Sequence, residues 1–282
     1  MRAALSVLCL LLGGCTQLFL QPGRELVRDP AQLGLRYEDT WIVAPDGARL
    51  HAWFLPAAAP ARGTVLHLHG NAENISTFIG ATHWLPQQGY NVLLLDYRGY
   101  GRSEGVATVA HLHEDAAAAL SHLLARADVA ARPVFVFGQS IGGSVAIRTA
   151  ARHPDRARIA AVVTEGAFSG YRRIAREKLD ALWLTWPLQW PLSLLFASEY
   201  DAEEAAGDLA MPLLLIHGER DPVVDVSHAR RLHAAARGPR ELWVMPEGQH
   251  VDALTHPVNR ERLLRYFASL ASLPSSVTPA AK

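Results

Sequence analysis

The stretch FGQSIGG at residues 137–143 decides which fold the chain is expected to adopt. It directly follows the apolar, β-branched run at 133–137 and leads without a spacer into a helical pattern that begins at Ser144. A strand, a sharp turn and a helix in immediate succession form a nucleophile elbow, in which the turn strains a serine backbone and lifts its hydroxyl above the carboxyl edge of a sheet. Ser140 is therefore the candidate nucleophile, and the flanking glycines leave room where strand and helix meet.

The same glycine-x-serine-x-glycine pattern occurs a second time, as GRSEG at 101–105 with Ser103 at its centre. The surroundings of this copy differ. The preceding strand-like run ends at Asp96, six residues intervene before the serine, and no helical pattern begins until about residue 107. We therefore predict that Ser103 is a loop serine, and that residues 96–105 form a structured loop at the edge of the sheet.

Eight short apolar runs along the body of the chain are typical of β-strands, and longer helical patterns separate most of them. Such alternation predicts a mostly parallel sheet with helices on both faces. The first two runs are joined by Pro45-Asp46-Gly47, a turn with no room for a crossover helix, so they are expected to pair antiparallel at one edge. The predicted strands cover residues 41–44, 50–55, 64–69, 90–96, 133–138, 159–164, 212–217 and 241–246.

The connection before the strand at 212–217 is long enough to hold an inserted element, which we place at about 167–208. Its central part, ALWLTWPLQWPLSLLF at 181–196, is strongly apolar. One interpretation is a pair of helices, broken at the prolines, that packs over the sheet. The other is a helical lid that walls an acyl-binding pocket and contacts a bilayer through its tryptophans. These tryptophans are Trp183, Trp186 and Trp190.

A serine hydroxyl is a weak nucleophile at neutral pH, so it needs a histidine to take its proton and a carboxylate to fix the tautomer of that histidine. In a mostly parallel sheet that carries a nucleophile elbow, the acid follows a late strand and the histidine follows the last strand. Asp221, in HGERDPVV, and His250, in PEGQHVD, stand at these two places. Asp225 lies in the same loop as Asp221 but suits a helix N-terminus. Asp208 and Asp252 are further competitors in weaker positions.

Two backbone amides are expected to form the oxyanion hole, in which each donor stabilises the transition state by about 3 kcal/mol. One is the amide of Ile141, directly after the nucleophile. The other belongs to the loop after the third strand, HLHGNAEN at 67–74, where Gly70 allows a tight turn and leaves the Asn71 amide as the donor. The alternative for this loop is a plain glycine turn without a catalytic role.

Cofactor and nucleic-acid functions find little support in the sequence. His67 and His69 lie two apart in a predicted strand, but no third ligand in a matching context stands near them, so we expect no metal site. Phosphate-binding and dinucleotide-binding motifs are also missing, and no cofactor is predicted. Lys plus Arg and Asp plus Glu are balanced at 27 each, so no summed charge attracts a polyanion.

The first residues, MRAALSVLCLLLGGCTQLF, resemble a bacterial lipoprotein signal. Their apolar run is shorter than the roughly 20 residues that span a bilayer, but it suits a secretory signal. In Leu12-Gly13-Gly14-Cys15, Cys15 would become the lipidated N-terminus, since two acyl chains suffice for stable anchoring. The alternative is an apolar N-terminus that is neither cleaved nor modified. The lipoprotein interpretation predicts a membrane anchor in the bacterial cell envelope, facing the periplasm or the exterior.

These observations divide the chain into four parts. A signal peptide comes first, followed by a lipidated N-terminus with a linker, the α/β domain and a disordered tail. Since both cysteines, Cys9 and Cys15, precede the domain, no disulfide bond is expected within it. The predicted ranges are 1–14, 15–37, 38–271 and 272–282.

The order and content of several motifs resemble the α/β-hydrolase fold superfamily, and more narrowly the serine-hydrolase branch that includes the eukaryotic depalmitoylases with an α/β-hydrolase domain and their bacterial relatives. The resemblance implies Ser140 as nucleophile, Asp221 as acid and His250 as base, with Asn71 and Ile141 as oxyanion donors. Glu73 departs from the glycine that is more frequent in relatives. The motifs are HGNAEN, DYRGYGRSEG, GQSIGG, EGAFSGYRRIAREKL, HGERDPVV and GQH.

The resulting functional hypothesis is a serine hydrolase that cleaves a small-molecule or lipid acyl ester, or a thioester, through an acyl-enzyme. A serine rather than an aspartate at the elbow argues against dehalogenase and epoxide-hydrolase chemistry. A second hypothesis is a serine aminopeptidase or amidase, in which Glu73 or Glu165 would hold the free amine of the substrate. A third, from another class, is a non-catalytic envelope lipoprotein that uses the fold for binding.

Overall fold

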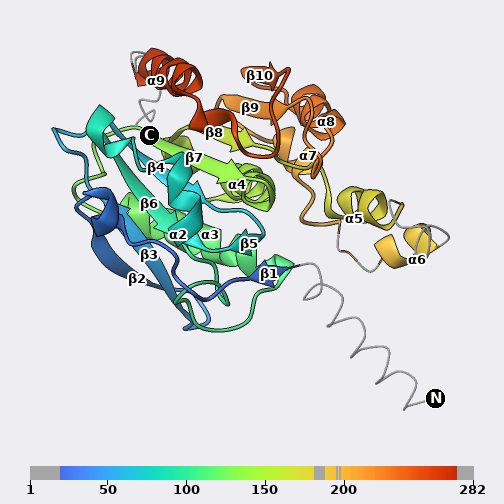
Figure 1. Ribbon diagram of the computed structural model, residues 1–282, viewed down its shortest axis with the longest axis horizontal. Helices are drawn as coiled ribbons and strands as arrows, with labels where there is room; N and C mark the ends of the chain where they lie inside the picture. Colours follow the sequence, from blue (N-terminus) through green and yellow to red (C-terminus); the bar gives the residue numbers. More distant parts are fainter. Residues whose placement is uncertain (1–19, 181–187, 195, 197, 272–282) are drawn as a thin grey trace, which may run out of the picture.

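A computed structural model describes residues 20–180, 188–194, 196 and 198–271 of the chain. Its centre is an eight-stranded sheet with the order β10-β9-β8-β7-β4-β6-β3-β2 (Figure 1). All eight predicted runs are strands of this sheet, with ends that move by three residues at most. The strands are β2 (Glu38–Val43), β3 (Arg49–Leu55), β4 (Gly63–Leu68), β6 (Tyr90–Leu95), β7 (Val134–Gln139), β8 (Ile159–Glu165), β9 (Leu213–Gly218) and β10 (Arg240–Met245).

Strand directions follow from the connections between the strands. The six strands from β10 to β6 in the sheet order are mutually parallel. β3 runs antiparallel to both β6 and β2, and the turn before it is closed by a hydrogen bond of 2.8 Å from the Gly47 amide to the Ala44 carbonyl. The predicted antiparallel pair is therefore confirmed, and it forms one edge of the sheet. The carboxyl ends of the parallel strands share a single edge, where loops from distant parts of the sequence meet.

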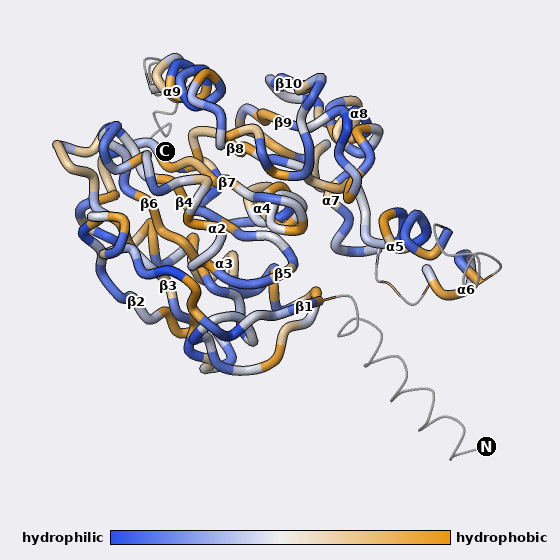
Figure 2. The backbone as a smooth tube through the Cα atoms, in the orientation of Figure 1, coloured by the Kyte–Doolittle hydropathy of each residue, from blue (hydrophilic) through white to orange (hydrophobic). Residues whose placement is uncertain are grey.

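Helices cover both faces of the sheet, as predicted. Buried side chains of α3, α4, α7 and α8 pack against one face, and those of α2 and α9 pack against the other. The strands between them are mostly apolar, as Figure 2 shows, because a parallel sheet is buried on both faces. The helices are α2 (Ile75–Phe78), α3 (Val109–Ala125), α4 (Ile141–Arg152), α5 (Tyr171–Asp180), α6 (Gln189–Ser193), α7 (Ala202–Ala206), α8 (Ser227–Ala235) and α9 (Pro257–Ala271).

The long connection between β8 and β9 holds α5, α6 and α7. α7 packs against α4 and α8 and so belongs to the body of the domain. α5 packs against α6, and the two lie to one side of the sheet in Figure 1. Trp190 of α6 is 65% exposed, with the Arg176 guanidinium 4.5 Å from its ring centroid. Trp183 and Trp186 lie outside the described residues, so the lid stays a prediction.

The segment before β2 differs from the linker predicted for residues 15–37. Within its described part, Leu20 is buried in the core, and β1 (Gln21–Pro22) pairs in parallel with β5 (Ala72–Glu73). Asp29 caps a short 3-10 helix, η1 (Pro30–Leu33), by accepting from the Ala31 amide at 2.7 Å. This segment therefore packs on the domain from residue 20 onward.

Three predicted features lie outside the described residues: the signal peptide, the lipidation site Cys15 and the tail at 272–282. Among the residues that are described, no helix has the length and apolar character needed to span a membrane.

Candidate active site

Ser140 occupies the sharp turn between β7 and α4. Its backbone has φ 54° and ψ −121°, a conformation that is strained for a residue with a side chain. Two hydrogen bonds hold it there: the Ser140 amide donates to the Glu165 carbonyl at 2.8 Å, and the Gly143 amide donates to the Ser140 carbonyl at 3.0 Å. The predicted sequence of strand, turn and helix is therefore present, with the strain that a nucleophile elbow requires.

The glycines around this serine are needed for close packing. A Cβ on Gly138 would overlap the Gly142 carbonyl oxygen, and a Cβ on Gly142 would overlap the Leu68 carbonyl oxygen of β4. A Cβ on Gly143 would lie 2.7 Å from the Ala167 Cβ, closer than such atoms approach. The turn can thus pass between β4 and β8 only without side chains at these positions.

Asp221 and His250 come together at the same edge of the sheet. The His250 Nδ1–H donates to Asp221 Oδ2 at 2.7 Å, and the Asp221 side chain is fully buried. The other oxygen, Oδ1, accepts from the amides of Val223 at 2.7 Å and Val224 at 2.9 Å. Burial alone would raise the pKa of Asp221, but the His250 bond and the two amides outweigh it and hold the pKa below its usual value. Asp221 is thus an ionised partner for His250.

The competing carboxylates have other partners. Asp225 Oδ1 accepts from the Ser227 amide at 2.9 Å at the start of α8, which is the structural role considered for it. Asp208 pairs with Arg152 at 3.0 Å, and Asp252 Oδ2 accepts from the Gln249 amide at 3.1 Å. Of these four carboxylates, only Asp221 accepts a hydrogen bond from His250.

The backbone at residues 165 and 166 links the histidine to the nucleophile. The carbonyl of Glu165 accepts from the Ser140 amide, and a Cβ on Gly166 would lie 3.1 Å from both Cε1 and Nδ1 of His250. Ser140 and the His250 ring therefore lie against neighbouring residues at the end of β8.

The two predicted oxyanion donors also lie beside Ser140. Ile141 is the first residue of α4, and the first amides of a helix have no partner within the helix. Gly70 is close to the nucleophile, since a Cβ on it would be 3.5 Å from the Ser140 Cβ, and Asn71 follows it directly. Tyr100 donates to the Asn71 carbonyl at 2.8 Å, and Asn71 Oδ1 accepts from the Gln21 amide of β1 at 3.2 Å. Neither contact was predicted from the sequence.

A cavity of about 260 Å³ is lined by Ser140 and by both residues of the predicted oxyanion hole, Asn71 and Ile141. Its lining is mainly apolar, and α5 contributes both an apolar side chain and an ammonium group. No carboxylate lines it within the described part of the chain. The lining residues are Gln21, Asn71, Ser140, Ile141, Phe168, Ile174, Lys178, Val223 and Val224.

Comparisons with known proteins identify the family of the chain. Residues 59–195 match a family described as serine aminopeptidase, S33. The chain is 34% identical over 240 residues to the protein YfhR of Escherichia coli strain K12, covering 82% of this chain and 81% of that protein. It is 36% identical over 234 residues to the "Alpha/beta hydrolase domain-containing protein WAV2" of Arabidopsis thaliana, covering 79% and 75% of the two chains. The chain belongs to the α/β-hydrolase family.

A solved structure extends the likeness to three dimensions. The esterase Pf2001 of Pyrococcus furiosus matches this α/β hydrolase with a TM-score of 0.69 at 25% sequence identity, and the match covers 89% of this chain and 95% of that one. The family and the fold are thus as the motifs predicted.

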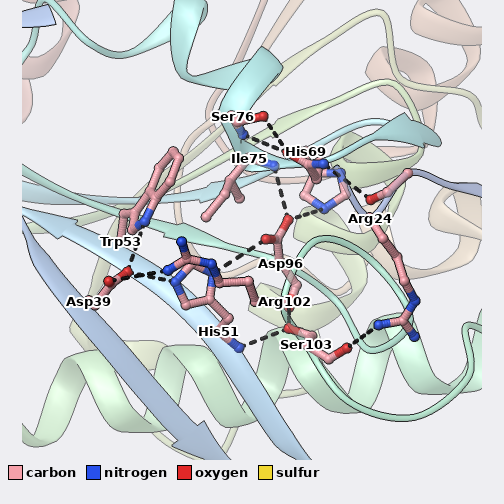
Figure 3. A network of polar contacts seen from close by, with 12 residues as sticks. Arg24, Asp39, His51, Trp53, His69, Ile75, Ser76, Asp96, Arg102 and Ser103 are labelled. Atoms are coloured by element: carbon pink, nitrogen blue, oxygen red, sulfur yellow. Dashed lines mark hydrogen bonds and ion pairs between the residues drawn. The ribbon is translucent and has the colours of Figure 1, made fainter. Parts of the chain in front are cut away.

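The second serine of the glycine-x-serine-x-glycine pattern has a structural role in this α/β hydrolase. Ser103 is fully buried, its hydroxyl donates to the Asp96 carbonyl at 2.7 Å, and the same oxygen accepts from the His51 amide at 2.8 Å (Figure 3). Ser103 therefore joins the loop after β6 to β3, as expected for a loop serine.

His67 and His69 are both buried. Burial lowers the pKa of His67 to about 3, and its Nε2 donates to Gln139 Oε1 at 3.1 Å. Burial also lowers the pKa of His69, whose Nδ1 donates to the Gly70 carbonyl at 2.7 Å. No group of three or more metal-ligating side chains occurs among the residues that the structure describes.

Glu73, in the loop that carries Asn71, has φ 61°. The left-handed region is unfavourable for a residue with a Cβ, so we expect Glu73→Gly to stabilise the fold by about 1 kcal/mol. Urea unfolding of the purified domain measures this change. Glu73→Ala is the matched control, because it removes the charge but keeps the Cβ and so should give no comparable gain. Equal stabilisation by both variants would assign the effect to charge rather than to backbone strain.

Proposed function

We propose that this α/β hydrolase is a serine hydrolase that cleaves a carboxylic ester or thioester through an acyl-enzyme on Ser140. The observation that carries the proposal is the hydrogen bond from His250 to the fully buried Asp221 carboxylate, at the sheet edge where the strained Ser140 lines a cavity. No other serine in the described part of the chain combines a turn of this kind with a cavity.

The proposed reaction begins with proton transfer. The Nδ1–H of His250 is held by Asp221, so Nε2 is the nitrogen that takes the Ser140 proton as Oγ attacks the acyl carbon. The amides of Ile141 and Asn71 stabilise the oxyanion that forms. His250 then protonates the leaving alcohol or thiol, whose bond to the acyl carbon breaks. In the second half, His250 activates a water molecule that releases the acid and restores Ser140.

The charge of the cavity favours an ester over an aminopeptidase substrate, despite the description of the matched family. A free amine requires an acidic group in the pocket, yet Lys178 is the charged residue that lines it. Glu73 is exposed and outside the lining. Glu165 is buried, which raises its pKa to about 7, and its carboxylate is bound to Gln139 and to the Leu254 amide. Neither glutamate is therefore placed to hold the amine.

Lys178 is also the basis of a prediction about substrate preference. We expect Lys178→Gln to lower the ratio of kcat/KM for p-nitrophenyl hemiglutarate over p-nitrophenyl valerate by about two- to fivefold, the range of an exposed ion pair. The two esters have acyl chains of equal length and differ in the terminal carboxylate. Lys178→Arg, which keeps the charge, should retain the ratio of the unmodified enzyme. If Lys178→Gln leaves that ratio unchanged, Lys178 does not contribute to substrate choice.

A fluorophosphonate probe tests the proposed function itself, because it reacts covalently with an activated serine. We expect the full chain to be labelled, Ser103→Ala to remain labelled, and Ser140→Ala to be unlabelled. His250→Ala should be labelled far more slowly, since the serine then lacks its base. If the unmodified protein is not labelled and no acyl ester is hydrolysed, the binding-protein hypothesis replaces the enzymatic one.

A further inference from the structure

Asp96 lies against both ends of the loop that carries Asn71. Its buried carboxylate follows directly on β6, and Oδ1 accepts from the amide of Ile75, the first residue of α2, at 2.9 Å (Figure 3). The same oxygen lies 3.6 Å from Nε2 of His69, at the start of the loop. One carboxylate thus contacts residues 69 and 75, and the predicted oxyanion donor lies between them.

A second buried histidine lies behind this carboxylate. His51 of β3 is fully buried, and its Nδ1 is 3.5 Å from Asp96 Oδ2. On its other side, His51 Nε2 lies 2.7 Å from Oδ1 of Asp39, which also pairs with Arg102 at 3.4 Å (Figure 3). A continuous row of polar groups therefore leads from the partly exposed Asp39 to the loop beside Ser140.

The donors and acceptors of this row require an additional proton. The Gly70 carbonyl can only accept, so His69 Nδ1 carries a hydrogen, and His51 Nε2 likewise donates to the Asp39 carboxylate. If both imidazoles were neutral, each would turn a lone pair toward Asp96. His51 Nδ1, His69 Nε2 and Asp96 Oδ2 are all buried and lack a hydrogen-bond partner. One further hydrogen among these three groups, on an imidazole nitrogen or on Asp96 Oδ2, would complete the hydrogen bonds of the cluster.

His51 is the better place for this proton. Its ring lies between two carboxylates, with Nε2 2.7 Å from Asp39 Oδ1 and Nδ1 3.5 Å from Asp96 Oδ2. His69 faces only Asp96, and burial lowers its pKa. A hydrogen on His51 Nδ1 would then point at Asp96 Oδ2, while Asp96 Oδ1 accepts from the Ile75 amide.

We propose that Asp96, paired with a protonated His51, is a positioning residue that holds the loop 69–75 in the geometry needed to stabilise the oxyanion. This inference rests on the proposed ester hydrolysis. Asp96 touches neither substrate nor Ser140 in this role, and it acts through the backbone of the loop. The network is thus a support for transition-state stabilisation that lies outside the catalytic triad and the two oxyanion amides.

Asp96→Asn is the main test, because it keeps the size of the side chain and removes its charge. We expect kcat for p-nitrophenyl butyrate to fall by about 10- to 100-fold, part of the effect of losing one oxyanion donor, with KM within about twofold. A trifluoromethyl ketone, which binds to serine as an oxyanion, should lose affinity in parallel with kcat/KM. A variant whose kcat and ketone affinity match the unmodified enzyme would overturn the proposal.

The matched control is Asp115→Asn. Asp115 is another fully buried carboxylate, on α3, and it binds Arg98 Nε at 2.8 Å without contacting the loop. Its replacement should lower the melting temperature but leave kcat and ketone affinity unchanged. If Asp115→Asn weakens ketone binding as much as Asp96→Asn does, the effect is one of general stability and the proposal is wrong.

His51→Gln and nitrogen-15 NMR examine the second half of the proposal, and they also serve if Asp96→Asn does not fold. His51→Gln should reduce kcat, as Asp96→Asn does. Both ring nitrogens of His51 should carry protons at neutral pH, whereas a single protonated nitrogen would contradict the proposal. If the unmodified enzyme hydrolyses esters and the variants do so equally well, only this inference fails. If it hydrolyses none, the proposed function fails with it.

Discussion

Ser140→Ala is expected to lower ester turnover by about 10⁴-fold or more, to the level that oxyanion stabilisation and binding alone provide. The fold should remain, because the amide of residue 140 still donates to the Glu165 carbonyl and the side chain takes no part in capping α4. Initial rates with p-nitrophenyl butyrate, together with a thermal melt, measure both quantities.

Ser103→Ala is the control for this prediction. Its hydroxyl joins the Asp96 carbonyl to the His51 amide, so its removal should cost about 1–3 kcal/mol of stability while most of the turnover remains. Substantial ester hydrolysis by Ser140→Ala, beyond what contaminating esterases explain, would show that Ser140 is not the nucleophile.

Asp221→Asn is expected to lower kcat by about 10⁴-fold, although the side chain keeps its shape. An amide in this place cannot stabilise a charged imidazole, and it can turn the wrong tautomer of His250 toward Ser140. Asp225→Asn is the control, and it should change kcat little because Asp225 binds the Ser227 amide instead. Similar losses in the two variants would leave the identity of the acid open.

The same substitution has a consequence for stability that depends on pH. Despite burial, the folded-state pKa of Asp221 lies below the ordinary aspartate value of 3.8, because His250 and two backbone amides bind the carboxylate, so the stabilisation that it provides is fully present above about that pH. It is lost as pH falls through the lower folded-state value. Urea unfolding should therefore show a larger stability difference between Asp221→Asn and the unmodified enzyme at pH 7 than near pH 3. A constant difference would show that the Asp221 carboxylate gains nothing from its partners.

Much of the fold was predictable because buried parallel strands have continuous apolar sequences. TVLHLH and PVFVFG each give one strand of the sheet, and the burial pattern confirms that neither face is exposed. β1 and β5 were not predictable, since a two-residue ladder leaves no periodic signal. For the same reason the chain before residue 38 resembled a linker, although Leu20 lies in the core.

The site was predictable to the extent that chain order and local context determine it. Asp221 and His250 each follow a strand, so parallel pairing brings their loops to one edge. The supports around them depend on contacts between distant segments, such as Tyr100 on Asn71 and His51 on Asp96. No spacing in the sequence encodes such contacts. Only the excess of polar residues in otherwise apolar strands, as at His51, could have drawn attention to them.

Three residues other than glycine have a positive φ among those described: Glu73, Ser140 and Val251. Each belongs to a different loop of the active edge, and each costs about 1–3 kcal/mol. Together these three strain energies are a sizeable part of the free energy of unfolding of a domain, which is roughly 5–15 kcal/mol. Selection for heat resistance can therefore relieve the backbone strain in some of these loops and not in others. It can replace Glu73 by glycine, whereas at Ser140 any residue that relieves the strain also removes the proposed nucleophile. This part of the cost therefore remains as long as the activity does.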